Sequence, residues 1–175
     1  QCSKRSAQTI VNQYDEISLR RLFKDYGELR NAAQLARSIV EFRSEKPIET
    51  TFQLKKLLSR YLPKAKHNKA MAQIFQAIRI EVNNELEALK SFLIDAMIIL
   101  NPCGRLSVIS YHSLEDRLVK RFIRNGMFEG EPQRDVFGNY EVPFKKIGKL
   151  IIPSKNEIEK NRRARSAKLR IAQKV

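Results

Sequence analysis

A histidine and a serine stand where a predicted strand gives way to a predicted helix, a position suited to acid–base chemistry or anion binding. Segment 105–111 is short, apolar and rich in β-branched residues, which predicts a buried strand, and His112 and Ser113 follow it. Ligands of open α/β sheets bind beyond the carboxyl ends of strands, and a helix N-terminus favours anions. His112 could therefore act as an acid, a base or a hydrogen-bond donor. The structural alternative is that His112 packs at the strand end while Ser113 caps the helix, with Asp116 as its capping-box partner.

Three polar residues share one face of a long helix predicted over residues 70–100. Gln76, Arg79 and Asn83 are spaced three and four residues apart and lie beside an apolar stripe. This face could line a cleft and contact a nucleotide. It could equally be an ordinary solvated helix face, and the spacing alone does not decide between the two.

The C-terminal segment carries the densest positive charge. Residues 151–175 hold eight Lys and Arg against two Glu, with Arg163, Arg165, Lys168 and Arg170 crowded at a predicted strand. Such runs contact phosphates, and they supply affinity rather than sequence readout. The alternative is an exposed edge strand whose cations guard against aggregation.

The composition points to an acidic partner. The chain has 175 residues, with 34 Lys and Arg against 19 Asp and Glu, a net charge of +15. Nucleic acid is the first candidate and an anionic membrane surface the second. The two cysteines stand far apart with no Cys/His cluster, so we expect no metal site and a reducing, cytoplasmic setting. The longest apolar run, around 92–100, is too short to span a membrane.

The sequence patterns of the helices and strands that carry these residues predict a mostly α protein with a small α/β part. Short amphipathic helices fill the first third, and a polar basic hinge at 64–69 leads into the long helix. The strand and helix after it are typical of one unit of a doubly wound sheet. Further strands are predicted at 147–152 and 167–173, with a short helix at about 155–161 between them. In the last strand Leu169 and Ile171 point one way, and Lys168 and Arg170 point the other way.

This set of strands is incomplete for such a sheet. Strand 105–111 is apolar on both faces and needs strands on both sides, yet only two more are predicted. We therefore expect further sheet from an upstream part of the protein or from a partner chain, and the start at Gln1 agrees with something having been removed. The sequence has no glycine-rich phosphate or dinucleotide loop.

Three blocks of sequence carry a family resemblance. They are IFQAIRIEVNNEL at 74–86, RLSVISYHSLEDRLVK at 105–120 and RARSAKLR at 163–170. Together they resemble the bacterial S-adenosylmethionine-dependent methyltransferases that modify N4 of a cytosine in small-subunit ribosomal RNA. Two departures are a long connection at 126–143 and Cys103 where the family usually has glycine.

The resemblance implies a helical insertion domain at 1–66 and the C-terminal portion of a Rossmann-like methyltransferase domain at 67–175. It implies S-adenosylmethionine as cofactor, with the main cofactor-binding residues absent from this chain, so the chain alone should be inactive. It places His112 and Ser113 at the base or its phosphate, and Gln76, Arg79 and Asn83 along the cleft. The expected contacts to the RNA backbone come from the following residues: Lys120, Arg163, Arg165, Lys168 and Arg170. The expected partner is small-subunit ribosomal RNA, without a metal or a membrane, and a homodimer is left open.

Two other classes of function stay open from the residues themselves. The chain could be a self-standing basic helical module that binds RNA. It could also be a protein-interaction scaffold whose charge only aids solubility. A salt-dependent affinity for RNA would separate these two, because phosphate contacts release counterions and a scaffold has none to release.

Overall fold

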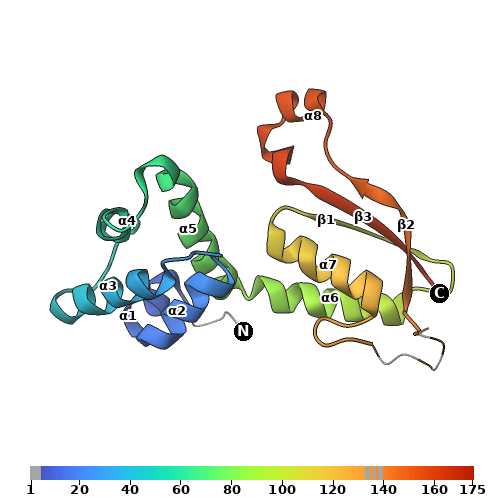
Figure 1. Cartoon of the computed structure of the whole chain (residues 1–175), viewed down its shortest axis with the longest axis horizontal. Coiled ribbons are helices and arrows are strands. Elements are labelled where there is room, and N and C mark those ends of the chain that lie inside the picture. The colour runs from blue at the N-terminus through green and yellow to red at the C-terminus, as the bar shows by residue number, and fades with distance from the viewer. Residues whose placement is uncertain (1–4, 133–134, 136, 138–139) are drawn as a thin grey trace. The chain divides into compact units, whose positions relative to one another are not determined.

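The computed structural model describes residues 5–132, 135, 137 and 140–175, and these form two compact units, Gln1–Glu85 and Leu86–Val175 (Figure 1). Each unit has its own hydrophobic core. Within the described residues, none of the helices is both long and apolar enough to cross a bilayer. Gly138, which lies in the loop predicted at 126–143, is outside the described residues, as is Cys2.

The first unit is helical, as the amphipathic patterns predict. Residues with an extended backbone cap three of its helices through their side chains: Ser6 accepts from the Thr9 N–H, Asp15 from that of Ser18 and Thr50 from that of Gln53. The elements of this unit are α1 (Ala7–Gln13), α2 (Glu16–Asp25), α3 (Ala32–Glu45), α4 (Thr51–Ser59), the 3₁₀ turn η1 (Lys64–Lys66) and α5 (His67–Asn83).

The core of the helical unit draws on all five helices. Phe23 of α2, Leu35 and Ile39 of α3 and Leu58 of α4 are fully buried, and Ile74 of α5 joins them. Removing such large side chains from water is the main favourable contribution to folding. The unit is therefore held by a contiguous apolar interior rather than by its few surface ion pairs.

The helical unit extends beyond the boundary predicted at residue 66. The basic hinge is the short η1 turn, and α5 after it packs Ile74, Ala77 and Ile78 into the helical core, so the compact unit ends at Glu85. The charge of residues 64–69 marks a turn, but the apolar face of the next helix decides where the unit ends. The assignment of the two parts to an insertion and a catalytic domain stays a prediction.

The single helix predicted over 70–100 is wrong, because the chain forms two helices there. α5 ends at Asn83, and α6 covers Glu85–Ile99. Asn84 between them has φ 52° and ψ 40°, a left-handed conformation that asparagine tolerates better than most residues. The apolar pattern continues through this point, and it therefore gives no sign of the break.

The second unit packs helices against one face of a small sheet. It comprises α6, β1 (Arg105–Ser110), α7 (Ser113–Asn125), β2 (Phe144–Ile151), α8 (Lys155–Lys160), the 3₁₀ segment η2 (Arg162–Ser166) and β3 (Lys168–Lys174). Leu93 of α6 and Phe122 of α7 are buried with Leu106, Phe144 and Ala172 of the strands. Gly126 ends α7 with φ 72°, a conformation that glycine adopts without strain.

The described strands pair only antiparallel, in the order β1–β3–β2. A mostly α fold with a small α/β part is therefore confirmed in outline, whereas these strands alone do not form a doubly wound parallel sheet. β1 lies at one edge and buries Leu106, Val108 and Ser110 while Ile109 stays 57% exposed. Of the described strands, β1 pairs only with β3, so the strand predicted to need neighbours on both sides has one.

Candidate nucleic-acid interface

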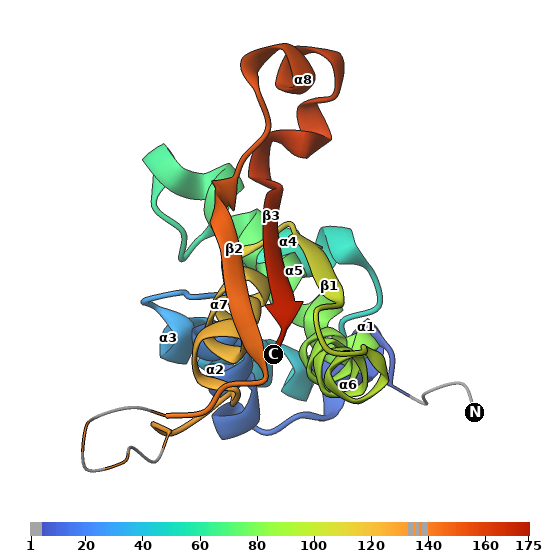
Figure 2. The same ribbon diagram turned by 90° about the vertical axis from the view of Figure 1, so that its right-hand side faces the viewer.

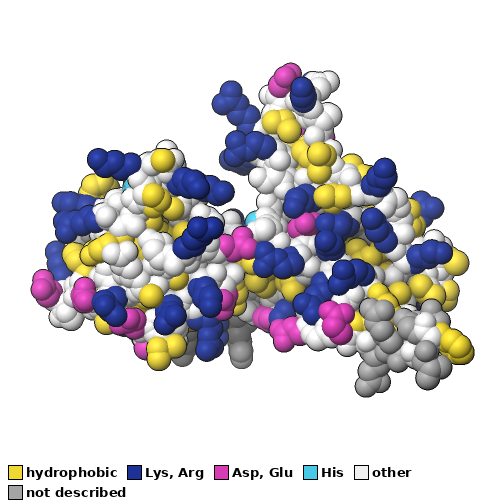
Figure 3. Space-filling view, in the orientation of Figure 1, with side chains coloured by type: hydrophobic (Ala, Val, Ile, Leu, Met, Phe, Trp, Pro, Cys, Tyr) yellow, Lys and Arg dark blue, Asp and Glu magenta, His cyan; other side chains and the backbone are white. Residues whose placement is uncertain are grey.

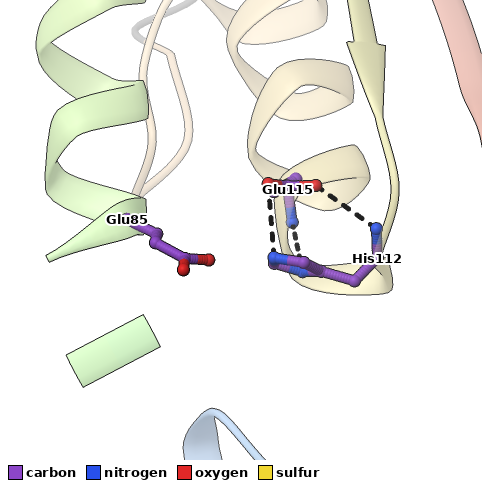
Figure 4. A group of neighbouring side chains, drawn as sticks. All are labelled: Glu85, His112 and Glu115. Carbon is purple, nitrogen blue, oxygen red and sulfur yellow. Dashed lines mark hydrogen bonds and ion pairs between the residues drawn. The ribbon is translucent and has the colours of Figure 1, made fainter. Parts of the chain in front are cut away.

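The turn between β1 and α7 is built around His112, which is the N-cap of the helix. His112 has extended backbone angles, and its Nδ1 accepts the Glu115 N–H at 3.4 Å. Glu115 Oε2 in turn accepts the N–H of His112 at 3.3 Å (Figure 4). The same oxygen accepts the N–H of Tyr111 at 2.8 Å. The two residues form a reciprocal capping box that satisfies backbone donors at the start of α7.

The predicted cap at Ser113 with Asp116 is therefore wrong by one residue. Ser113 is the first residue of α7, and Asp116 points to β3 instead. The shift arises because Glu115 is a better capping-box partner than Asp116, and the imidazole of His112 can accept as a serine hydroxyl does. His112, with a side chain 9% exposed, thus helps to hold the strand-to-helix turn. A catalytic role for His112 and Ser113 stays a prediction.

Glu115 is held in its ionised form by this turn. Burial raises the pKa of its carboxyl, but the His112 side chain and the N–H groups of Tyr111 and His112 outweigh that effect and lower the pKa from 4.5 to about 2. Because the pKa is lower in the folded state, the stabilisation is present above about pH 4.5. It is lost as the pH falls toward 2.

We expect Glu115→Gln to destabilise the chain at pH 7 by about 1 kcal/mol, because glutamine keeps an acceptor oxygen for the capping box but loses the negative charge at the helix N-terminus. This difference from the wild type should shrink between pH 4.5 and 2, because the carboxyl of the unfolded chain takes up its proton over this range while that of the folded chain does so only near pH 2. Urea unfolding at a series of pH values measures it. A difference that stays constant down to pH 2 would contradict the ionised cap.

Asp116 fixes α7 to β3 through two cations. Its carboxylate lies 2.7 Å from the Arg170 Nε and 3.0 Å from the Lys168 Nζ. The Arg170 side chain is 14% exposed and that of Lys168 38%. Burial raises the pKa of Asp116, but the lowering effect of Arg170 and Lys168 is larger. The pKa of this carboxyl is therefore below its usual range. These cations support the fold, and Arg170 has little surface to offer to RNA.

The two faces predicted for the last strand are present, and the face that carries the cations lies toward α7. Ala172 is the buried residue of β3, and it shares its face with Lys168 and Arg170. The carboxylate of Asp116 makes this possible because it forms ion pairs with both cations beneath α7. Leu169 and Ile171 are half-buried on the opposite face.

Arg163 and Arg165 lie on a projecting segment between β2 and β3. Residues 152–167 form α8 and η2 beyond the end of the sheet (Figure 2), and Lys and Arg side chains gather there (Figure 3). We call this segment the basic finger. Its cations are all exposed, and none forms an ion pair with a described carboxylate: Lys155, Lys160, Arg162, Arg163 and Arg165. Lys155 and Lys160 lie outside the basic run that the sequence indicates, although their place around a short capped helix was a usable signal.

The polar stripe of α5 is partly engaged within its own unit. Arg79 donates from Nε and Nη2 to the two carboxylate oxygens of Glu85, at 2.8 and 3.0 Å, and Asn83 donates to the same residue at 3.0 Å. Gln76, one turn earlier on α5, is half-buried. Sequence reasoning missed Glu85, which brings Arg79 and Asn83 together. The role of this stripe in contacting a nucleotide stays a prediction.

The sequence of this chain is similar to known proteins along both compact units. The MraW methylase family matches residues 1–175. Proteins named "Ribosomal RNA small subunit methyltransferase H" are similar along the chain. The one from Flavobacterium johnsoniae is 64% identical over 170 residues, covering 97% of this chain and 56% of the relative. The one from Christiangramia forsetii is 60% identical over 175 residues, covering 100% and 58%. That of Cytophaga hutchinsonii is 51% identical over 170 residues, covering 97% and 57%.

The chain thus spans somewhat more than half the length of the curated relatives it matches. The match runs through both compact units and includes the β1–α7 turn and the basic finger. The chain therefore belongs to the MraW methylase family.

Proposed function

We propose that this chain is part of an enzyme that transfers a methyl group from S-adenosylmethionine to N4 of a cytosine in small-subunit ribosomal RNA, in the cytoplasm. The observation that carries the proposal is the family match over residues 1–175, together with the printed names of relatives up to 64% identical. The exposed basic finger supports an RNA partner, because clustered Lys and Arg contact phosphates.

The proposed chemistry is methylation of the exocyclic amine, for which S-adenosylmethionine would supply an activated methyl group and leave as the neutral thioether. The amine would release its proton to water. Such a step depends mainly on alignment and on exclusion of water. Here His112 and Glu115 would position the strand-to-helix turn, and Ser113 at the start of α7 would face the base or a phosphate.

The described residues do not fit a complete cofactor site. The turn between β1 and α7 consists of Tyr111 and His112, and it lacks the glycines that let a backbone approach a cofactor closely. We therefore place the S-adenosylmethionine site in the part of the relatives' length that this chain does not span, and expect the chain alone to be inactive.

A Rossmann-like sheet that continues past β1 is part of the same proposal. Ile109 on the outer face of β1 is 57% exposed, and Ile151 of β2 is 49% exposed. A sheet with apolar residues on both faces is typical of α/β domains covered by helices on each side. The remaining length of the relatives would supply the neighbouring strand and the second layer.

The test is methyl transfer from tritiated S-adenosylmethionine to small ribosomal subunits. We expect the full-length gene product to label the RNA at a cytosine N4, and the 175-residue chain to give no labelling and no cofactor binding in calorimetry. Labelling at another atom would contradict the proposed specificity. Tight cofactor binding by the shorter chain would contradict the proposed position of the cofactor site.

A second candidate is a self-standing basic module that binds RNA without catalysis. The helical unit has a hydrophobic core of its own, which favours this candidate because a unit with its own core can fold independently. The same assay separates the two, since a binding module would retain RNA affinity while the full-length gene product transferred no methyl group.

A further inference from the structure

A cavity of about 360 Å³ lies beside β2 in the second unit, apart from the β1–α7 turn. Its wall is mostly apolar. Ile123 and Phe144 are buried at this wall, and Ile147, Leu150 and Ile171 are half-buried. The volume is within the range of pockets that hold a small ligand group.

An irregularity in β2 coincides with this cavity. Ile147 pairs with Ile171 and Ile151 pairs with Leu169, so a step of four residues on β2 opposes a step of two on β3. Gly148, within the extra residues, has φ 64°, and a Cβ there would meet no atom within 4 Å. Such bulges bend a strand away from its partner and often adjoin functional sites. Here the bulge places Lys149 and Leu150 at the cavity.

The described residues that line the cavity include a group of cations and no acidic residue. Arg124 donates to the Asn125 Oδ1, and Arg170 is held by Asp116. Four exposed lysines complete the lining, and none of them forms an ion pair with a described carboxylate: Lys120, Lys145, Lys146 and Lys149. An apolar wall with a lysine rim is complementary to a ligand that is both apolar and anionic.

We propose that this cavity binds one unpaired nucleotide of RNA, with the base against the apolar wall and the flanking phosphates on the lysines. The inference rests on the proposed function, which supplies RNA as the partner. A polyanion is favoured because lysines from both α7 and β2 surround the cavity, so charge continues on either side of the bound base. Lys120, predicted from the sequence as a backbone contact, would be one of these phosphate ligands.

The probe is an RNA hairpin with one unpaired 2-aminopurine, compared with the same hairpin fully paired. We expect the 175-residue chain to change the 2-aminopurine emission and to bind the unpaired hairpin more tightly. Leu150→Trp fills the cavity and should weaken that binding about tenfold, while affinity for the paired hairpin stays the same. Lys149→Gln, an exposed change that leaves the core intact, should lower the slope of log affinity against log salt by about one.

The matched control is Ile98→Trp, which adds the same ring to a residue of α6 that is 72% exposed and outside the cavity. It should leave both affinities unchanged. If Leu150→Trp binds the unpaired hairpin as the wild type does, while removal of the finger arginines weakens it, the cavity proposal fails and RNA binding stands. If the wild type binds neither hairpin at low salt, the proposed RNA partner fails and the cavity proposal with it. Binding of a fluorescent fatty acid that Leu150→Trp abolishes, with RNA unaffected, would assign the cavity to a lipid and overturn the proposal.

Discussion

Asp116→Ala should lower the free energy of unfolding of this chain by about 3 kcal/mol, the cost of leaving a buried cation without its partner. Asp116 is 8% exposed and binds Lys168 and Arg170 across the contact between α7 and β3. The substitution leaves the Arg170 guanidinium, whose side chain is 14% exposed, beneath α7 without a counter-charge. Lys168 is more exposed and can turn to water, so Arg170 accounts for most of the loss.

Urea unfolding monitored by circular dichroism measures this loss. Asp95→Ala removes an acid from α6 in the same unit, and should change the free energy of unfolding by less than about 0.5 kcal/mol. Asp116→Ala combined with Arg170→Met should recover part of the loss, because the buried charge is then gone as well. Equal effects of Asp116→Ala and Asp95→Ala would show that the network contributes nothing to stability.

Much of the helical unit could be predicted from the sequence, because its signals are local. Ser6 and Thr50 are residue types that favour helix starts and are followed by apolar residues at helical spacing, and both cap helices in the structure. Pro63 stops one helix, and the apolar stripe of α5 identifies its buried face. Capping and periodicity depend only on neighbours along the chain, and a single sequence therefore shows them.

The break between α5 and α6 could not be predicted in the same way. Asn84 adopts a left-handed conformation, and no Gly or Pro marks the site. Apolar residues recur before and after it, so the pattern is that of one continuous helix. The extent of the helical unit escapes sequence reasoning for a related reason, since it depends on the packing of α5 against helices far away in sequence.

The candidate site shows the same division between local and long-range information. The basic C-terminal segment is evident from composition, but the roles of its residues depend on Asp116, which lies 52 and 54 residues from Lys168 and Arg170. Alternation identifies two faces of β3, and it does not say which one lies beneath α7. Arg163 and Arg165, on the finger, have the exposure expected of phosphate contacts.

The combined change Arg162→Gln, Arg163→Gln and Arg165→Gln should weaken binding to small-subunit ribosomal RNA by about 10- to 100-fold at roughly 0.1 M salt. These arginines are exposed on η2, and none is engaged by a described carboxylate, so all three are available to phosphates. Each arginine that binds a phosphate should, when replaced, lower the slope of log affinity against log salt by about one. Fluorescence anisotropy with labelled RNA over a series of salt concentrations measures both quantities.

The matched control removes the same charge from the helical unit: Arg20→Gln, Arg21→Gln and Lys24→Gln, all exposed on α2. If the finger binds phosphates directly, the triple change there should lower the salt slope by about two to three, whereas the α2 variant should leave the slope nearly unchanged. Equal effects of both variants would mean that only the net charge of +15 matters, and the finger would then have no special role. The comparison therefore separates a placed contact surface from general attraction between a basic protein and RNA.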